Sequence, residues 1–216
     1  TAVGACSLYA NTTGASLVAL GYRALAANTC GNNNTGLGFN ALQANTTGHS
    51  NTASGYRAMF DNTTGNWNTA YGRHSLENNT TAPYNVALGA CTLFSNTTGE
   101  NNTAVGYQAL KTNTGSDDNT AVGTYALCLT TGCKNTAVGK SAVQGNTTGN
   151  FNVGFGNFAL ATNSSGNYNT AIGTCALYDN TTASYNVGVG FRTLCDNTTG
   201  FKNTASGTYA SQSNTT

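Results

Sequence analysis

The sequence predicts an all-β fold, a parallel β-solenoid (β-roll) of about 13 coils, each of about 17 residues. A glycine recurs thirteen times at a spacing of seventeen, as in Gly4, Gly21 and Gly38, except for one step of sixteen between Gly123 and Gly139. Asn, Thr and Gly are abundant, there is one Pro, and the apolar residues lack helical periodicity, which favours strands and turns. A unit this short cannot bury an apolar edge alone, so the units must stack.

The repeat reads Asn-Thr-Ala-Val-Gly-Tyr-x-Ala-Leu-x-x-Asn-Thr-Thr-Gly-x-x, and its residues are numbered as repeat positions 1 to 17. Position 2 is Thr or Val, and position 4 is mostly Val, Leu or Ile, as in Thr103 and Val105. Alternation along a strand places both on one face, which we expect to be the interior. Position 3, as in Ala104, is always Ala or Gly and points the opposite way, where its small size predicts a close neighbour.

The glycine at position 5 is expected to bend the chain. Position 9 is Leu, Met or Val in twelve units and predicts a second, shorter apolar edge, so that each coil carries two short strands. Asn-Thr-Thr-Gly at positions 12 to 15 is typical of a turn. Thirteen rungs of about 4.8 Å would form a rod about 60 Å long. Residues 1–216 are therefore expected to form a single continuous solenoid domain, as a segment of a longer fibre.

The segments "NTAVGYQALKTN" and "NTAIGTCALYDN" resemble the head repeats of trimeric autotransporter adhesins, and also Asn-Thr-Ala-Val-Gly-Tyr-rich repeats of some bacterial and phage tail-fibre proteins. The resemblance covers the whole chain. It implies a left-handed parallel β-roll and three rolls packed along a common axis, where small residues allow close approach. A homotrimer is the partner that this resemblance predicts.

The Asn at position 12 is followed by x-Ser/Thr in ten units and would form one line along the rod. One interpretation is a column of N-linked glycans on an exposed turn. The alternative is a ladder of unmodified Asn side chains that cap the turn backbone. The candidate acceptors are Asn11, Asn45, Asn62, Asn79, Asn96, Asn146, Asn163, Asn180, Asn197 and Asn214.

Seven cysteines leave room for disulfides between or within coils. Cys128 and Cys133 flank the turn of the shortened unit, and Cys175 and Cys195 lie in adjacent units. The first pair is predicted to form a bridge across that turn, and the second pair a bridge between two coils if its Cα atoms approach within about 7 Å. Free thiols remain the alternative.

Aromatic residues and cysteines also recur at a longer spacing, once every five coils. This spacing indicates either a five-coil super-period or chance within a small alphabet. The pairs are Trp67 and Phe151, Tyr71 and Phe155, Tyr84 and Tyr168, and Cys91 and Cys175.

No catalytic, cofactor or metal site is predicted, so the chain is not expected to be an enzyme. His49 and His74 lie in different units without a ligand set at metal-binding spacing. "GFGNFA" from Gly154 matches a dinucleotide-type pattern, but its glycines fall at repeat positions 3 and 5. The seven scattered acids supply no carboxylate cluster for a polysaccharide-active enzyme.

The leading hypothesis is a structural extracellular fibre or adhesin shaft at a cell or virion surface. Both ends of the sequence lie within a unit, which predicts end-to-end stacking on further copies. Net charge is +1 and the eight Lys/Arg are scattered, which disfavours nucleic acid, and no apolar run is long enough to span a membrane. The alternative is an ice-binding or ligand-binding Thr/Asn array. The expected inward orientation of the position 2 side chains disfavours this alternative.

Overall fold

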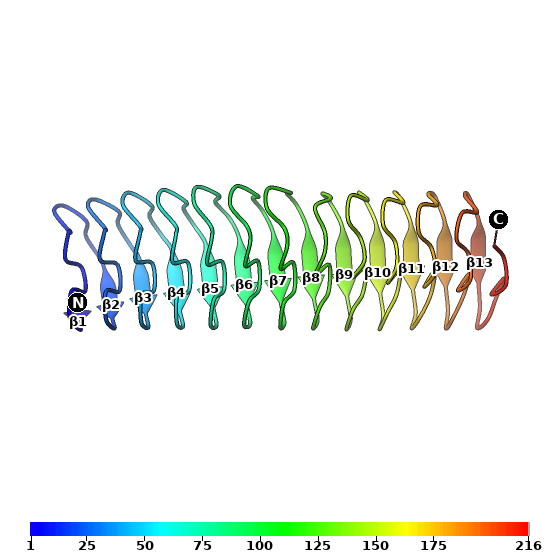
Figure 1. Ribbon diagram of the computed structural model, residues 1–216, viewed down its shortest axis with the longest axis horizontal. Coiled ribbons are helices and arrows are strands. Elements are labelled where there is room, and N and C mark those ends of the chain that lie inside the picture. Colours follow the sequence, from blue (N-terminus) through cyan, green and yellow to red (C-terminus); the bar gives the residue numbers. More distant parts are fainter. Residues whose placement is uncertain (216) are drawn as a thin grey trace.

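The computed structural model describes residues 1–215 and forms one solenoid whose strands make a single parallel sheet in chain order. Figure 1 shows the strands side by side along the rod, with the N- and C-termini at opposite ends. The strands are β1 (Ala2–Val3), β2 (Val18–Leu20), β3 (Thr35–Leu37), β4 (Thr52–Ser54), β5 (Thr69–Tyr71), β6 (Val86–Leu88), β7 (Thr103–Val105), β8 (Thr120–Val122), β9 (Thr136–Val138), β10 (Val153–Phe155), β11 (Thr170–Ile172), β12 (Val187–Val189) and β13 (Thr204–Ser206).

The coils stack in register, so each repeat position forms a column along the rod. Ala104 pairs with Ala121, the equivalent residue of the next coil. The shortened unit does not disturb the columns, because Thr120 in β8 pairs with Thr136 in β9 and the missing residue is absorbed in the turn. The predicted fold class and repeat length are confirmed.

The orientation predicted for the strand is wrong. Position 3, rather than positions 2 and 4, faces the interior: Ala104 is fully buried, while Thr103 and Val105 on either side of it are partly exposed. The small residues at position 3 therefore pack inside their own coil. They supply no surface for close approach of a second chain, which the adhesin resemblance implied.

The narrow interior explains why position 3 accepts only Ala or Gly. The core consists mainly of the position 3, position 8 and position 9 columns, as in Ala104, Ala109 and Leu110. A Cβ added to Gly36 would already lie 3.3 Å from Cγ of Leu25. A larger side chain at position 3 would overlap the Leu column that fills the core.

Each coil contains one strand, and the predicted second strand is absent within residues 1–215. Positions 6 to 11 form a turn segment in which residues with positive φ alternate, for example Gln108 (φ 56°) and Leu110 (φ 52°). This segment still bonds neighbouring coils: the N–H of Leu110 donates to the carbonyl of Ala126 at 3.1 Å. The apolar edge predicted at position 9 is confirmed, but on a left-handed backbone instead of an extended one.

The glycine at position 5 is required for two reasons. Gly55 has a φ of 140°, a conformation that side-chain-bearing residues rarely adopt. A Cβ at Gly55 would also lie 2.5 Å from the carbonyl oxygen of Gly72 in the next coil. The bend and the tight coil-to-coil approach therefore exclude every other residue.

Candidate functional site

The Asn side chains at position 12 form a buried ladder along the rod. Nδ2 of Asn79 donates to Oδ1 of Asn62 in the preceding coil at 2.8 Å and to the carbonyl of Ala82 in its own turn at 3.0 Å. Oδ1 of Asn79 accepts from Nδ2 of Asn96 in the following coil at 2.9 Å. Most inner amides thus join three coils, and each closes the turn that follows it.

A second Asn ladder runs beside the first at position 1. The backbone N–H of Asn68 donates to Oδ1 of Asn51 at 3.0 Å, and Nδ2 of Asn68 donates to the carbonyl of Ala82 at 2.8 Å. Asn68 is fully buried. The hydroxyls at position 13 form a third set of coil-to-coil bonds, as where Thr46 donates to the carbonyl of Thr63 at 3.1 Å. Burial of so many polar groups is tolerated because they bond one another.

The position 12 ladder is interrupted once, at the shortened coil. Thr130 replaces Asn there, and its Oγ1 accepts from Nδ2 of Asn146 and from the N–H of Gly132. Oδ1 of Asn113, in the coil before, is buried and has no hydrogen-bond partner among the described residues. This interface therefore lacks the ladder bond, as does the interface that follows Asn197, whose Oδ1 is also buried without a hydrogen-bond partner among the described residues.

The exposure expected of the glycan acceptors is wrong for the eight inner residues, which are fully buried and form the Asn ladder that was the alternative. An N-linked glycan is attached through Nδ2, the atom that makes two of the ladder bonds. A glycan would therefore break the ladder at Asn45, Asn62, Asn79, Asn96, Asn146, Asn163, Asn180 or Asn197. Asn11 and Asn214 lie in the terminal coils and are partly exposed, so glycosylation stays a prediction at these two.

All seven cysteines are free thiols in the structure, so neither predicted bridge is present. Sγ of Cys133 accepts from the backbone N–H of Asp117 at 3.5 Å. Burial raises the pKa of Cys128, and burial also raises the pKa of Cys195, although the neighbouring Arg192 opposes this shift. The raised pKa values keep these two thiols protonated and unreactive at neutral pH.

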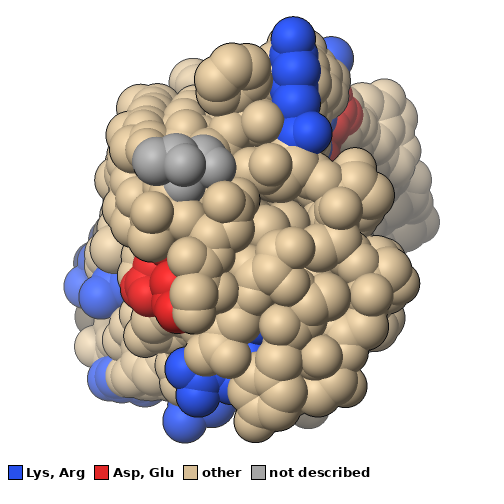
Figure 2. All heavy atoms as spheres, turned by 90° about the vertical axis from the view of Figure 1, so that its right-hand side faces the viewer, with Lys and Arg blue, Asp and Glu red and all other residues tan. Residues whose placement is uncertain are grey.

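The outward face of the sheet carries no charged residue at positions 2 and 4 of any coil. Its position 2 column is nine Thr and four Val, and its position 4 column is mainly aliphatic, with Tyr71 and Phe155 the most prominent aromatic residues at 64% and 53% exposure. All Lys, Arg, Asp and Glu lie at positions 6, 7, 10, 11, 16 or 17. Figure 2, which looks along the rod, shows the charges as separate groups around the cross-section with uncharged surface between them.

Exposed aromatic rings stack along the rod at positions 6 and 17. Phe151, Tyr168 and Tyr185 at position 17 have ring centroids 4.8 Å and 5.1 Å apart and are nearly parallel. Trp67 and Tyr84 stack in the same way five coils earlier, at 5.1 Å. Both stacks are consistent with the five-coil super-period. The rings lie one above another because the coils stack in register, and they pack outside the hydrophobic core.

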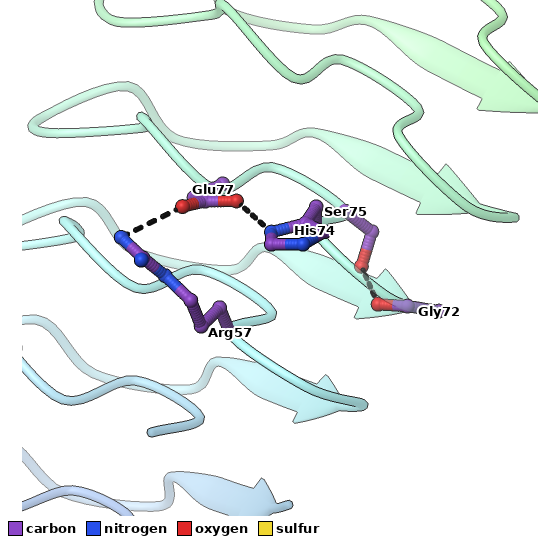
Figure 3. Close-up of polar contacts among 5 residues, drawn as sticks. All are labelled: Arg57, Gly72, His74, Ser75 and Glu77. Carbon is purple, nitrogen blue, oxygen red and sulfur yellow. Dashed lines mark hydrogen bonds and ion pairs between the residues drawn. The ribbon is translucent and has the colours of Figure 1, made fainter. Parts of the chain in front are cut away.

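Coils 4 and 5 carry the ion-pair cluster of the described chain, shown in Figure 3. Oε1 of Glu77 lies 2.8 Å from a terminal nitrogen of Arg57, and Nδ1 of His74 lies against Oε2 of the same carboxylate. Arg57 also stacks on Phe60, with its guanidinium carbon 4.1 Å from the ring centroid. Burial, and secondly the charge of Glu77, raises the pKa of Asp61, although Arg57 opposes the shift. No sequence signal pointed to this cluster beyond the i, i+3 spacing of His74 and Glu77.

Two hollows lie on the side of the rod that carries positions 7, 10 and 11. The larger, about 590 Å³, spans coils 1 to 3 and includes Tyr9, Arg23 and Gln43 in its lining. The second, about 380 Å³, spans coils 10 to 12 and includes Tyr178 and Arg192. Sequence reasoning missed both, because each combines side chains from three coils.

No group of three or more His, Cys, Asp or Glu side chains that could hold a metal ion occurs within residues 1–215. His49 packs edge-on against Trp67 at 4.6 Å, well removed in sequence from the His74 cluster. Gly154 and Gly156 lie at the interior position and at the bend of their coil, where a Cβ at either would meet neighbouring atoms. The same part of the chain contains no helix with the length and apolar character needed to cross a membrane.

No known protein family matches the chain, and no significant match occurs among the curated proteins or the solved structures.

Proposed function

We propose that the chain is a rigid structural rod, the shaft of an extracellular fibre or adhesin, and not an enzyme. The observation that carries this proposal is the unbroken in-register stack. Backbone bonds join all thirteen coils, and buried Asn ladders link most of them without a loop inserted anywhere along the columns of the described chain. Such an arrangement gives a fixed length and resists bending, since every coil contacts its neighbours over its whole circumference.

The partner in this proposal is a further copy of the chain, packed side by side through the uncharged sheet face or stacked end to end. Exposed apolar residues of the position 4 column extend over much of the rod, from Val3 at 55% to Val189 at 37% exposure. Contiguous apolar surface of this extent is uncommon on monomeric soluble proteins and is typical of interaction surfaces. A cell or virion surface is the location that this function would require.

Electron microscopy and sedimentation velocity of the purified chain test the proposal. We expect rods with the width of one or a few solenoids, and assemblies that dissociate when Val105 and Val122 are both replaced by Lys. The matched control replaces Thr64 and Thr98, exposed residues of the turn, by Lys. Compact particles would refute the rod, and a purely monomeric wild-type rod would refute the self-association.

A second candidate, binding of ice or another ordered water layer, is favoured by one observation. The structure turns the position 2 Thr column outward, which removes the objection that it faces the core. Thr103, Thr120 and Thr136 occupy position 2 of three successive strands, β7 to β9, and repeat at about 4.8 Å. Thermal hysteresis that is lost in Thr120→Tyr would support this function, and its absence in the wild type would refute it.

A further inference from the structure

The two hollows on the side of the rod are built from the same three residue types at the same places. Each has a Cys at position 7 and a Tyr at position 10 of one coil, followed by an Arg at position 7 of the next coil. The first set is Cys6, Tyr9 and Arg23, and the second set is Cys175, Tyr178 and Arg192. The sets are ten coils apart, which is twice the five-coil super-period.

The five-coil position between them serves as an internal comparison. Cys91 is present there, but Phe94 replaces the Tyr and Gln108 replaces the Arg. In this region His74 packs edge-on against Phe94, with ring centroids 6.2 Å apart. The two hollows therefore coincide with the two places that have both the Tyr and the Arg.

Each hollow presents a guanidinium group that is available to a ligand. Arg23 forms no ion pair with a carboxylate of residues 1–215. Arg192 contacts the thiol of Cys195, but the side chain is partly exposed and lines the second hollow. A guanidinium binds a carboxylate through two parallel hydrogen bonds, which selects an oxyanion as the complementary group.

Each hollow also presents a second hydrogen-bonding side chain and aromatic rings. In the first hollow, the partly exposed Gln43 supplies an amide group, and Tyr9 and Tyr22 supply the rings. In the second hollow, Asp179 supplies the acceptor, and Phe158 and Tyr178 supply the rings, which lie 6.3 Å apart. An acceptor requires a donor such as a hydroxyl, and a ring face is complementary to the C–H groups of a saturated ring.

We propose that each hollow binds one acidic sugar, a saturated ring that carries a carboxylate and several hydroxyl groups, such as a hexuronic acid. The carboxylate bonds Arg23 or Arg192, a hydroxyl bonds the amide of Gln43 or the carboxylate of Asp179, and the sugar ring lies against the aromatic rings. Volumes of about 590 and 380 Å³ are within the range of small-molecule sites. The first hollow is the stronger site, because Asp179 adds a negative charge to the second.

Calorimetric titration of the folded chain with sodium D-glucuronate tests the proposal, with glucose and inorganic phosphate as comparison ligands. We expect saturable binding at two sites, weaker or absent for both comparison ligands. Arg23→Gln and Arg192→Gln should each weaken one site about tenfold or more, because each removes a charge-assisted hydrogen-bond pair. Arg73→Gln removes the same charge from an exposed position outside the hollows and should change nothing.

Arg23→Lys keeps the charge without the planar fork and provides a second variant should Arg23→Gln fold poorly. It should bind with an affinity between those of the wild type and Arg23→Gln. The proposal is overturned if glucose or phosphate binds as tightly as glucuronate, or if neither Arg variant alters binding. It is also overturned if the wild type shows no saturable binding at glucuronate concentrations well above about 1 mM.

Discussion

Replacing Asn79 by Ala is the most direct test of the buried Asn ladder. The substitution removes three hydrogen bonds, to Asn62 at 2.8 Å, to Ala82 at 3.0 Å and from Asn96 at 2.9 Å. It leaves Oδ1 of Asn62 without a partner, whereas the carbonyl of Ala82 keeps the bond from Asn68 at 2.8 Å. One N–H of Asn96 is also left unpaired, and each buried polar group without a partner costs about 1 to 3 kcal/mol, so the free energy of unfolding should fall by about 2 to 6 kcal/mol.

Urea denaturation followed by circular dichroism measures this loss, and hydrogen exchange locates it. A stack of repeats can unfold in parts, so the amides of coils 4 to 6 should exchange faster even where the global transition shifts little. Asn78→Ala is the matched control, because Asn78 makes no side-chain hydrogen bond to the described residues and Ala occupies the same repeat position in coils 1 to 3. If Asn79→Ala and Asn78→Ala differ by less than about 1 kcal/mol, the ladder does not stabilise the fold as argued.

Three further substitutions probe the backbone and the ion cluster. Gly55→Ala should lower the free energy of unfolding by at least about 3 kcal/mol or prevent folding, because it combines a disfavoured φ with a clash against Gly72. A stability within about 1 kcal/mol of wild type, measured by urea denaturation, would contradict the backbone geometry. Ser50 has a φ of 58°, a left-handed conformation that favours Gly and disfavours β-branched residues. Ser50→Gly should therefore stabilise the fold by up to about 1 kcal/mol, and Ser50→Val should destabilise it. The reverse order of stability would be evidence against the left-handed turn. The pKa of Asp61 is raised in the folded state, so the fold is stabilised by the protonated carboxyl and loses stability as pH rises from the unfolded pKa through the folded pKa. Asp61→Asn should therefore be more stable than wild type at pH 7 but not at pH 3. An equal gain in stability at both pH values would exclude titration of Asp61 as the cause.

The repeat length, the parallel stacking and the coil count could be predicted because they depend on periodicity alone. The Gly spacing identifies each coil, and the single shorter step predicts where the turn is shortened, between Gly123 and Gly139. In-register pairing follows, since each coil can form columns of like residues only with the adjacent coil in the same register.

The inside and outside of the strand could not be assigned from residue type. Thr103 and Val105 are favoured in strands whether they face the core or solvent, and their alternation with Ala104 is equally compatible with either orientation. The decisive quantity is the width of the core, which the position 9 side chains of one coil, such as Leu110, already fill. That width depends on the left-handed backbone at positions 7 and 9, which has no sequence signature because Cys, Arg, Tyr and Leu all adopt it.

Of the polar features, only the Asn column at position 12 could be predicted from the sequence, and only as two alternatives. A line of Asn residues at position 12 indicated either a glycan column or a ladder, and burial decides in favour of the ladder at the inner coils. The Arg57, Glu77 and His74 cluster and the two hollows combine side chains from different coils. A single sequence records that these residues exist but not that their columns lie beside each other.

The missing hydrogen bond at Asn113 bears on how the rod would fail under load. The bonds between coils run along the rod, so a pulling force passes through every coil-to-coil interface in series, and the interface with the fewest bonds yields first. Oδ1 of Asn113 faces Thr130 across the interface where the Asn ladder is interrupted. This interface is not the poorest in bonds, however, because the hydroxyls of Thr112 and Ser116 donate to carbonyls of the eighth coil and offset the missing ladder bond, so the shortened coil carries load as its neighbours do.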